Sequence, residues 1–582
     1  MIRDTFRVLG VDLATGKGWV EEIPGREEVL GGSGLAALLY ERYGRPELPW
    51  NHPAQPLIFT IGPLTGYFPL MSKTVAGFKS PYHDQYAESH GGGRSALALR
   101  FADLDALVIT GRAPRPSVLG VGSRHLELRE AHYLWGRDVL AVGKYLRRMF
   151  SGAGHRSILR IGPAGEQGCA YAGINVDTYR HFGRLGAGAV MGAKHLKAIV
   201  LQGDASFPLP EGKEYAARFA EVFRLLTATP MMQKYHNLGT PANIRVLNDL
   251  KALPWRNLTA TSDPRAEEIS GERFAEAVLL RNTACAGCPV GCIHLGFVRE
   301  KFMADHRYFY RQIAYDHEPI FAMGSMVGVT DPFQVLRLIE AADKMGLDVM
   351  SAGVALAWAA EAWERGLLTE EHTLVPLRFG DAVALEAAVR HLANGATDFY
   401  RLLAQGAAKA AAFYGGGEFA CVLGQEMAGY ATGEVFVVGQ ALGFRHSHLD
   451  AAGYAYDQKA TARNVEEALN YLVTEERQRV VLTSLVACLF AREVYRPEVV
   501  ADCLTVLGYG ELAGRLGEVG EAIQRRRRRL RLATGYDPTR VEIPRRVLEV
   551  ENWKGKVDPA FLARLKEAYA RAILELGREV SR

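Results

Sequence analysis

Three closely spaced cysteines constrain this chain more than any other feature. Cys285, Cys288 and Cys292 stand at C-x2-C-x3-C spacing among small residues, so their thiols can face one inorganic cluster. Cubane iron–sulfur clusters usually take four thiolates, and Cys488, far downstream, is available as the fourth. The alternative is a zinc site that uses His294 as a ligand. One cluster in a chain of this size indicates electrons that pass to or from a larger site, which the spacing does not identify.

The composition describes a multidomain protein with nearly balanced charge. A chain of 582 residues with 48% apolar content can bury several hydrophobic cores. Its 69 basic and 65 acidic residues give a net charge of +4, which argues against wholesale binding of nucleic acid. The exception is the arginine-rich run 525–531. This run predicts a solvated helix face, or else a docking site for an acidic electron carrier.

Cysteine usage and hydropathy predict a cytoplasmic protein. The seven cysteines are clustered, which suits a reducing compartment and not a disulfide framework. No run approaches the roughly eighteen apolar residues of a membrane-spanning helix, so no membrane insertion is expected.

The pattern of the chain changes near residue 208. Before it, glycine is frequent and residues 57–61, 106–110 and 198–201 read as strands, while 6–23 alternates around a turn and predicts a hairpin. After it, helical spacing dominates. We therefore expect an α+β fold with a β-rich domain at 1–208 and two largely helical domains at 209–418 and 419–582.

Several helices are predicted in the later part of the chain. Asp331 can cap a helix whose first residue is Pro332, and apolar residues then recur at helical spacing as far as Met345. Further helices are expected at 352–365, 382–392 and 465–489.

One stretch carries a family resemblance. Residues 183–194 read G-R-L-G-A-G-A-V-M-G-A-K, which resembles the G-R-x-G-x-G-A-V-M-G-S-K signature of tungsten-containing aldehyde:ferredoxin oxidoreductases. Other segments match the family in the same order along nearly the whole chain. They are residues 31–35, 62–66, 89–93, 161–166, 252–257, 343–348 and 543–546.

The resemblance implies a fold, cofactors and a reaction. In the family a β-rich domain forms a saddle under two pterins, and two helical domains close over it. The pterins hold tungsten, sometimes molybdenum, a magnesium ion bridges them, and a 4Fe-4S cluster lies beside them. The implied reaction oxidises an aldehyde, a small molecule, to a carboxylate and passes electrons to ferredoxin or an iron–sulfur subunit. The resemblance leaves open whether the chain forms a homodimer.

The resemblance also assigns a first group of cofactor-binding residues. Lys73 and Arg184 are expected to bind pterin phosphates, and the carbonyls of His90 and Leu185 to bind magnesium. Glycines allow backbone N–H groups to approach a phosphate closely; those expected to do so are Gly92, Gly93 and Gly186. Lys73 replaces the usual arginine of the family, and His90 replaces an asparagine. Without the resemblance, these glycine loops read equally well as tight turns.

A second group is expected on the helical domains. Asp343 and Leu347 match the pterin-contacting loop of the family, and Gly346 between them also reads as a helix cap. Residues 483–488 match the family's D-S-L-G-x-C, which assigns Thr483 and Ala487 to the pterin and supports Cys488 as the fourth cluster ligand. Thr483 replaces the family's aspartate and Val486 its glycine.

Glu318 and His448 are the catalytic candidates, because they match the family's Y-E-x5-G and R-G-A-x-H-L patterns. A carboxylate and an imidazole serve acid–base chemistry near neutral pH. The alternatives are a helix-capping glutamate and a core histidine. His317 and His446 are expected to make the pocket more basic.

Two other functions stay open at this point. The same cofactors could drive another low-potential reaction, such as reduction of an acyl thioester or a ring. A non-catalytic electron relay is the remaining alternative, but a relay has no use for residues such as Lys73, Arg184 and Asp343.

Overall fold

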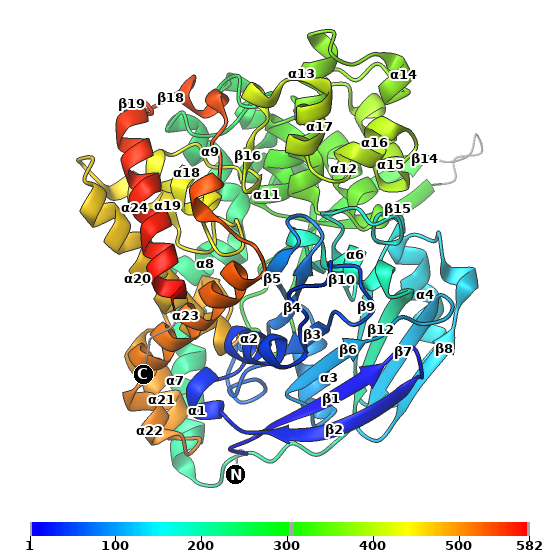
Figure 1. The fold of residues 1–582 in the computed structure, drawn as a ribbon, viewed down its shortest axis with the longest axis vertical. Coiled ribbons are helices and arrows are strands. Elements are labelled where there is room, and N and C mark those ends of the chain that lie inside the picture. Colours follow the sequence, from blue (N-terminus) through cyan, green and yellow to red (C-terminus); the bar gives the residue numbers. More distant parts are fainter. Residues whose placement is uncertain (1–2, 302–307, 579–582) are drawn as a thin grey trace.

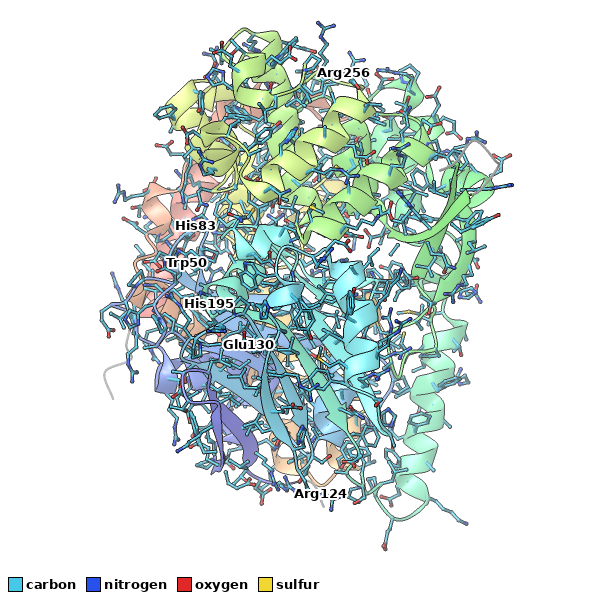
Figure 2. The ribbon with its side chains drawn as sticks, turned by 90° about the vertical axis from the view of Figure 1, so that its right-hand side faces the viewer. Trp50, His83, Arg124, Glu130, His195 and Arg256 are labelled. Atoms are coloured by element: carbon cyan, nitrogen blue, oxygen red, sulfur yellow. The ribbon has the colours of Figure 1, made fainter. Side chains whose placement is uncertain are left out.

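The computed structural model describes residues 3–301 and 308–578. The β-rich N-terminal part, blue to cyan in Figure 1, packs below green helices and beside the orange and red helices of the C-terminal part. In Figure 2, Arg124 in the β-rich part and Arg256 in the helical part lie at opposite ends of the molecule. The predicted α+β class, with strands first and helices after, is confirmed.

The first sheet runs in the order β2-β1-β6-β3-β4-β5. β1 and β2 form the antiparallel hairpin expected at 6–23, and β1 pairs in parallel with β6. Strand β5 ends at Gly91, and the next residue, Gly92, lies at the edge of the cavity between the domains. The strands are β1 (Phe6–Asp12), β2 (Lys17–Ile23), β3 (Leu57–Thr60), β4 (Thr74–Ser80), β5 (Gln85–Gly91) and β6 (Ala106–Thr110).

The second sheet runs in the order β11-β10-β9-β12-β7-β8. Its apolar side packs with that of the first sheet in one core, to which Phe59, Leu107, Leu159 and Ile199 belong. The strands are β7 (Ser117–Gly122), β8 (Leu126–Glu130), β9 (His155–Arg160), β10 (Ile174–Val176), β11 (Arg180–Phe182) and β12 (Leu196–Gly203).

Helices dominate the middle of the chain, but a small antiparallel sheet that was not expected lies beside them, at the edge of the molecule in Figure 1. This sheet is formed by β13 (Leu279–Thr283), β14 (Ile293–Lys301) and β15 (Tyr308–Tyr315), and the three cysteines lie in the loop between its first two strands. The main helices are α7 (Lys213–Ala228), α8 (Pro230–Asn237), α9 (Asn243–Asp249), α11 (His317–Ile320), α12 (Pro332–Met345), α13 (Val349–Glu364), α15 (Ala382–Asn394) and α17 (Ala407–Tyr414).

The C-terminal part is helical as well. Its main helices are α18 (Glu434–Ala441), α19 (Gly453–Lys459), α20 (Val465–Ser484), α21 (Pro497–Thr505), α23 (Leu516–Ala533) and α24 (Pro559–Gly577). Among the residues described, we find no helix both long and apolar enough to cross a membrane.

Local signals located most helix boundaries correctly. The Asp331 side chain accepts a hydrogen bond from the N–H of Gln334, and Pro332 opens α12, as predicted. The helix expected at 465–489 is too long, because α20 ends at Ser484. The chain then turns at Val486, whose φ of 56° no helix can accommodate.

Glycines of the first domain let the other domains approach its backbone. A Cβ on Gly32 would lie 2.2 Å from the carbonyl oxygen of Thr483, and one on Gly62 would lie 2.4 Å from that of Leu485. A Cβ on Gly162 would lie 2.3 Å from the carbonyl oxygen of Met345, at the end of α12. These motif glycines therefore fit loops of the later domains against the β-rich domain.

The arginine run 525–531 lies on α23, but the expectation of a solvated face is wrong for half of it. Arg527, Arg528 and Arg531 are buried, with exposures of 3%, 0% and 2%. Residues at these spacings share one helix face, and here that face is turned inward.

Buried arginines need partners, and those of α23 have them. Arg527 binds both carboxylate oxygens of Glu88, at 2.8 and 3.1 Å, and Arg528 binds Glu476 at 2.7 Å. Arg531 donates to the main-chain carbonyls of Gly443 and Phe444. Helix α23 therefore anchors β5 and the loop that carries His448.

Candidate active site

A cavity of about 1000 Å³ lies where the β-rich domain meets the helices. It brings together most of the site residues expected from the sequence. Those that line it are Lys73, His90, Gly92, Arg184, Cys285, Cys288, Cys292, Glu318, Asp343, Leu347, His448, Thr483, Ala487 and Cys488.

Three expected residues are not in the lining: Gly93, Leu185 and Gly186. The carbonyl of Leu185 accepts a hydrogen bond from the Ser80 hydroxyl at 2.7 Å. A Cβ on Gly186 would lie 2.4 Å from the carbonyl oxygen of Ala170, so this glycine serves close packing of the loop. The magnesium role expected of Leu185 stays a prediction.

The cysteine loops are held together by one residue of the first domain. The N–H of Leu70 donates to the carbonyl of Gly287, at 3.1 Å, and its own carbonyl accepts from the N–H of Cys488, at 2.9 Å. Gly287 and Gly291 both adopt φ of 67°, which lets the loop reverse direction between the thiols. Residues far apart in sequence thus meet at one end of the cavity.

The thiols influence one another electrostatically, and two cations lie beside them. Burial raises the pKa of Cys288 to about 12, and the nearby thiols of Cys488, Cys292 and Cys285 add to this rise. Burial is the largest single influence and lowers the pKa of Lys73, but the thiols of Cys488, Cys285 and Cys292 together raise it above its ordinary value. Lys73 thus lies against the cysteines, and not only near a phosphate position.

Arg180 is the second cation, and the sequence analysis missed it. It lies beside the Cys285 thiol and 3.8 Å from Asp316. Burial raises the pKa of Cys285, but Arg180 and Lys73 together bring it below its ordinary value. No sequence signal distinguishes Arg180 from other arginines, since only the fold brings β11 to the cysteine loop.

His294, the ligand of the alternative zinc site, is occupied elsewhere. Its Nε2 lies 3.1 and 2.9 Å from the carbonyl oxygens of His236 and Asn237, and its Nδ1 lies 3.2 Å from that of Cys292. This residue is a core histidine with main-chain partners. In the parts of the chain that are described, no three His, Cys, Asp or Glu side chains converge closely enough to hold a single metal ion.

Arg184 reaches into the cavity with part of its guanidinium group unsatisfied. Its Nη2 donates to the carbonyls of Glu426 and His446, both at 2.9 Å. Within residues 3–301 and 308–578, its buried Nε and Nη1 make no hydrogen bond, and Nη1 lies 3.8 Å from Oδ2 of Asp348. Two guanidinium nitrogens, Nε and Nη1, therefore still have N–H groups for an anion.

Asp343 and Leu347 lie where α12 ends against the first domain. Gly346 caps the helix at φ of 77°, so the helix-cap interpretation is confirmed. The Asp343 carboxylate lies 3.3 Å from Nε2 of His181, and burial, with Asp316 nearby, raises its pKa well above the usual value. A buried acid that keeps its proton can both donate and accept hydrogen bonds to a heterocycle.

One departure from the family pattern lies in the loop before Cys488. Val486 stands where the family has glycine, and its positive φ is one that glycine adopts without strain. Its carbonyl accepts from the N–H of Lys73, at 3.1 Å. Thr483 accepts from the Ser33 hydroxyl at 3.0 Å, so it ties the loop to the first domain.

Glu318 and His448 are in direct contact. Nε2 of His448 lies 3.1 Å from Oε1 of Glu318, and the Tyr430 hydroxyl donates to the same oxygen at 3.1 Å. Burial is the largest single influence and raises the pKa of Glu318, but the hydrogen bond and charge of His448, together with His317, outweigh it and lower the pKa of the carboxyl. Tyr430 also lines the cavity, and the sequence analysis missed it.

His317 and His446 do not make the pocket basic, contrary to expectation. His317 is fully buried and faces the carbonyl of Gly429, and His446 faces that of Gln440. Burial lowers the pKa of both rings, and Arg531 lowers that of His446 further. The lowered pKa values favour the neutral form of both rings, and neither ring belongs to the cavity lining.

His90 belongs to a buried chain of polar contacts. Its Nε2 lies 3.3 Å from Glu88, and its Nδ1 lies 3.1 Å from Nη1 of Arg445. Arg445 in turn binds Asp450 at 2.8 Å. This chain joins β5 to the loop that carries His448, so the two sides of the cavity are held in register.

These features fit the cofactors that the resemblance implies. The two unpartnered guanidinium nitrogens of Arg184 suit a phosphate. A Cβ on Gly92 would lie 2.9 Å from the sulfur of Cys285, so only glycine lets this loop come so near the thiol. The cysteines at one end and the acid–base pair on the wall leave a volume large enough for organic cofactors.

Comparison with known proteins supports this assignment. Residues 8–203 match the N-terminal domain of aldehyde ferredoxin oxidoreductase, and residues 219–572 match domains 2 and 3. Tungsten-containing aldehyde ferredoxin oxidoreductases of Thermococcus kodakarensis and Pyrococcus furiosus are each 29% identical, over 97% of this chain and 94% of theirs. A WOR-like subunit of an aliphatic sulfonate oxidoreductase from Pyrococcus furiosus is 30% identical over 70% of this chain and 66% of its own.

A solved structure shares the whole fold. The active-site complex BamBC of benzoyl coenzyme A reductase, bound to 1,5-dienoyl-CoA, superimposes with a TM-score of 0.78 at 19% identity. The match covers 98% of this chain and 95% of that chain. Fold and cavity thus define an oxidoreductase built on a β-rich domain with two helical domains. The chain belongs to the aldehyde ferredoxin oxidoreductase family.

Proposed function

We propose that this protein oxidises an aldehyde to a carboxylic acid and passes the electrons to ferredoxin or a similar iron–sulfur carrier. The observation that carries this proposal is the contact between His448 and Glu318 on the wall of a cavity that also holds Cys285, Cys288, Cys292 and Cys488. Acid–base groups beside a redox centre suit a reaction that removes both protons and electrons.

The cofactors belong to the proposal. The cysteines would hold a 4Fe-4S cluster, Arg184 and Lys73 would bind anionic parts of a bispterin, and Asp343 would bind a pterin ring. When bound, the tungsten or molybdenum bispterin accepts two electrons, which leave singly through the cluster. A magnesium ion between the pterins remains part of the proposal.

The protein's own residues handle the protons. Oxidation of an aldehyde consumes one water and releases two electrons and three protons as the carboxylate forms. Glu318 accepts a hydrogen bond from the Nε2–H group of His448, which leaves Nδ1 of the ring unprotonated and able to accept a proton. Tyr430 fixes the carboxylate from a second direction. His448 can therefore take a proton from the water that adds to the carbonyl.

The test is direct. Protein grown with tungstate or with molybdate is purified, its metals are determined, and simple aldehydes are offered with a viologen dye as electron acceptor. Aldehyde-dependent dye reduction by metal-loaded protein supports the proposal. Loaded protein that oxidises none of the aldehydes, yet reduces an acyl thioester with reduced viologen, contradicts it.

A further inference from the structure

The outer part of the cavity is lined by cations. They come from α8, α19, α20 and the segment that follows Cys488. These side chains are Lys234, Lys459, Arg479 and Arg492. Lys234 and Lys459 are exposed at the rim, Arg492 is half-buried and Arg479 is buried.

The acidic side chains of the lining do not neutralise this rim, because each of them faces another partner. These pairs are Glu88 with Arg527, Asp316 with Arg180, Glu318 with His448, Asp343 with His181, and Asp348 with Arg184. Only the residues next to each rim cation could therefore neutralise its charge.

Those neighbours neutralise one of the four cations fully. Arg479 binds Glu475 at 2.7 Å and the carbonyl of Leu449 at 2.9 Å. Lys234 has a neutral partner, Asn243, at 3.1 Å, and Lys459 forms no ion pair with any residue that the structure describes.

Arg492 has several partners, the Tyr235 hydroxyl among them, but its acidic partner is exposed to solvent. Its Nη1 donates to the carbonyl of Leu489 at 3.1 Å, and its Nε lies 3.6 Å from Glu493, whose side chain is 61% exposed. Water screens an ion pair with so exposed a partner. Arg492 can therefore exchange this contact for an anion in the cavity.

Aromatic rings connect Arg492 with the acid–base pair. Tyr430 and Tyr454 stack with their ring centres 4.6 Å apart, and His448 lies 5.1 Å from Tyr430 and 6.2 Å from Tyr454. The Arg492 guanidinium lies beside Tyr235 and Tyr454. A molecule that reaches His448 from the rim therefore passes aromatic walls and a cation.

We propose that the substrate carries an anionic group, a carboxylate or a phosphate, away from its reacting carbonyl, and that Arg492 binds this group with help from Lys459 and Lys234. Arginine suits the role, because its planar fork binds either anion through two hydrogen bonds. The position of the reacting end rests on the proposed function; the anion site rests on the rim itself.

The kinetic test compares substrates of similar size that differ in charge. Butanal is compared with 4-oxobutanoate, which adds a carboxylate, and glyceraldehyde with glyceraldehyde 3-phosphate. We expect kcat/KM of the wild type to favour the charged member of at least one pair, and that pair identifies the anion. Arg492→Gln should raise KM for the charged member roughly 10- to 100-fold, as expected for one hydrogen bond to a charged group. KM for the neutral member should change less than about twofold.

Two further variants make this result specific. Lys459→Gln removes a rim charge on α19 and should raise KM for the same anion by a smaller factor. Arg496→Gln removes an exposed arginine just before α21, outside the lining, and should change nothing. Equal effects of Arg492→Gln on both members of each pair would overturn the proposal, as would a wild type that prefers the neutral members.

A binding measurement separates this inference from the proposed function. Calorimetric titration of the holoprotein with succinate and with inorganic phosphate needs no turnover. Binding of one of them, weakened at least tenfold by Arg492→Gln and unchanged by Arg496→Gln, supports the anion site even if no aldehyde is oxidised. Failure of both anions to bind the wild type would overturn the anion site while leaving aldehyde oxidation intact.

Discussion

Nε2 of His448 lies 3.1 Å from Oε1 of Glu318, although Glu318 belongs to α11 and His448 to the loop between α18 and α19. The carboxylate fixes which ring nitrogen carries the proton. Removal of either partner should therefore disturb the chemistry more than the fold. This contact gives the two catalytic candidates one joint function.

His448→Ala should lower turnover by roughly 10²–10⁴, the usual range for a positioned acid–base group, and leave iron and tungsten content unchanged. Glu318→Gln should show a similar loss. Steady-state rates with several aldehydes and a viologen dye measure this. His132→Ala, an exposed histidine of the β-rich domain, is the control. Wild-type turnover by His448→Ala would assign the residue a structural role.

Tyr430→Phe should lower turnover by a smaller factor, roughly 2- to 10-fold, because Glu318 loses one of its two hydrogen bonds. The comparison variant is Tyr456→Phe, whose ring packs on Tyr471 outside the cavity lining. The turnover of both variants is measured in the same dye assay. An equal loss in both variants would show a general packing effect.

Cys488→Ala should reduce the iron content and bleach the broad visible absorption of the protein. Cys503→Ala should do neither, because that thiol is fully buried in α21 and outside the cavity. Iron analysis and absorption spectra of the two purified variants give the answer. The reverse pattern would move the fourth ligand from Cys488 to Cys503.

Arg184→Ala should yield protein depleted in both pterin and tungsten, since the change removes a cavity-lining cation with two unpartnered guanidinium nitrogens. Loss of such a charge-assisted bond weakens binding by about 1.5–3 kcal/mol. Arg112→Ala is a matched control, because Arg112 also donates to two main-chain carbonyls but lies outside the cavity. Full metal occupancy after Arg184→Ala would contradict the phosphate role.

Glu88→Gln should destabilise the protein by about 3–5 kcal/mol at pH 7, because Arg527 is left buried without its counter-charge. Burial opposes ionisation of Glu88, but Arg527 and His90 lower its pKa to about 2, against 4.5 in an unfolded chain. The stabilisation is therefore present above pH 4.5 and is lost as the pH falls from 4.5 toward 2. Thermal melting at pH 7 and pH 4 should show a Tm difference that shrinks in acid. The exposed Glu27→Gln should show no difference, and a gap that is independent of pH would refute the ionised pair.

Helices, strands and turns of this fold could be predicted from the sequence wherever a few neighbouring residues determine them. The hairpin at 6–23, the cap at Asp331 and the glycine end of α12 each depend on a few neighbouring residues. The length of α20 was overestimated because nothing local marks Val486 as a residue with positive φ. The family pattern, which has glycine there, contained that information.

The site was only partly readable, because its missing members act over long distances in sequence. Leu70 contacts the cysteine loops through its main chain, so the type of its side chain gives no sign of these contacts. Arg180 and Arg527 look like surface arginines until the fold gives them Cys285 and Glu88. The direct contact between Glu318 and His448 could be stated only once the domains were in place.

The two main-chain hydrogen bonds of Leu70, to Gly287 and to Cys488, have a consequence for how the protein is made. A nascent chain that has been translated as far as Cys292 can fold its β-rich domain and present three thiols, but Cys488 is still unmade. The hydrogen bond from Cys488 to Leu70 forms only after translation of the C-terminal helices is well advanced. If all four thiols bind one cluster, its insertion cannot be completed until Cys488 has been translated and the helices around it have packed onto the β-rich domain.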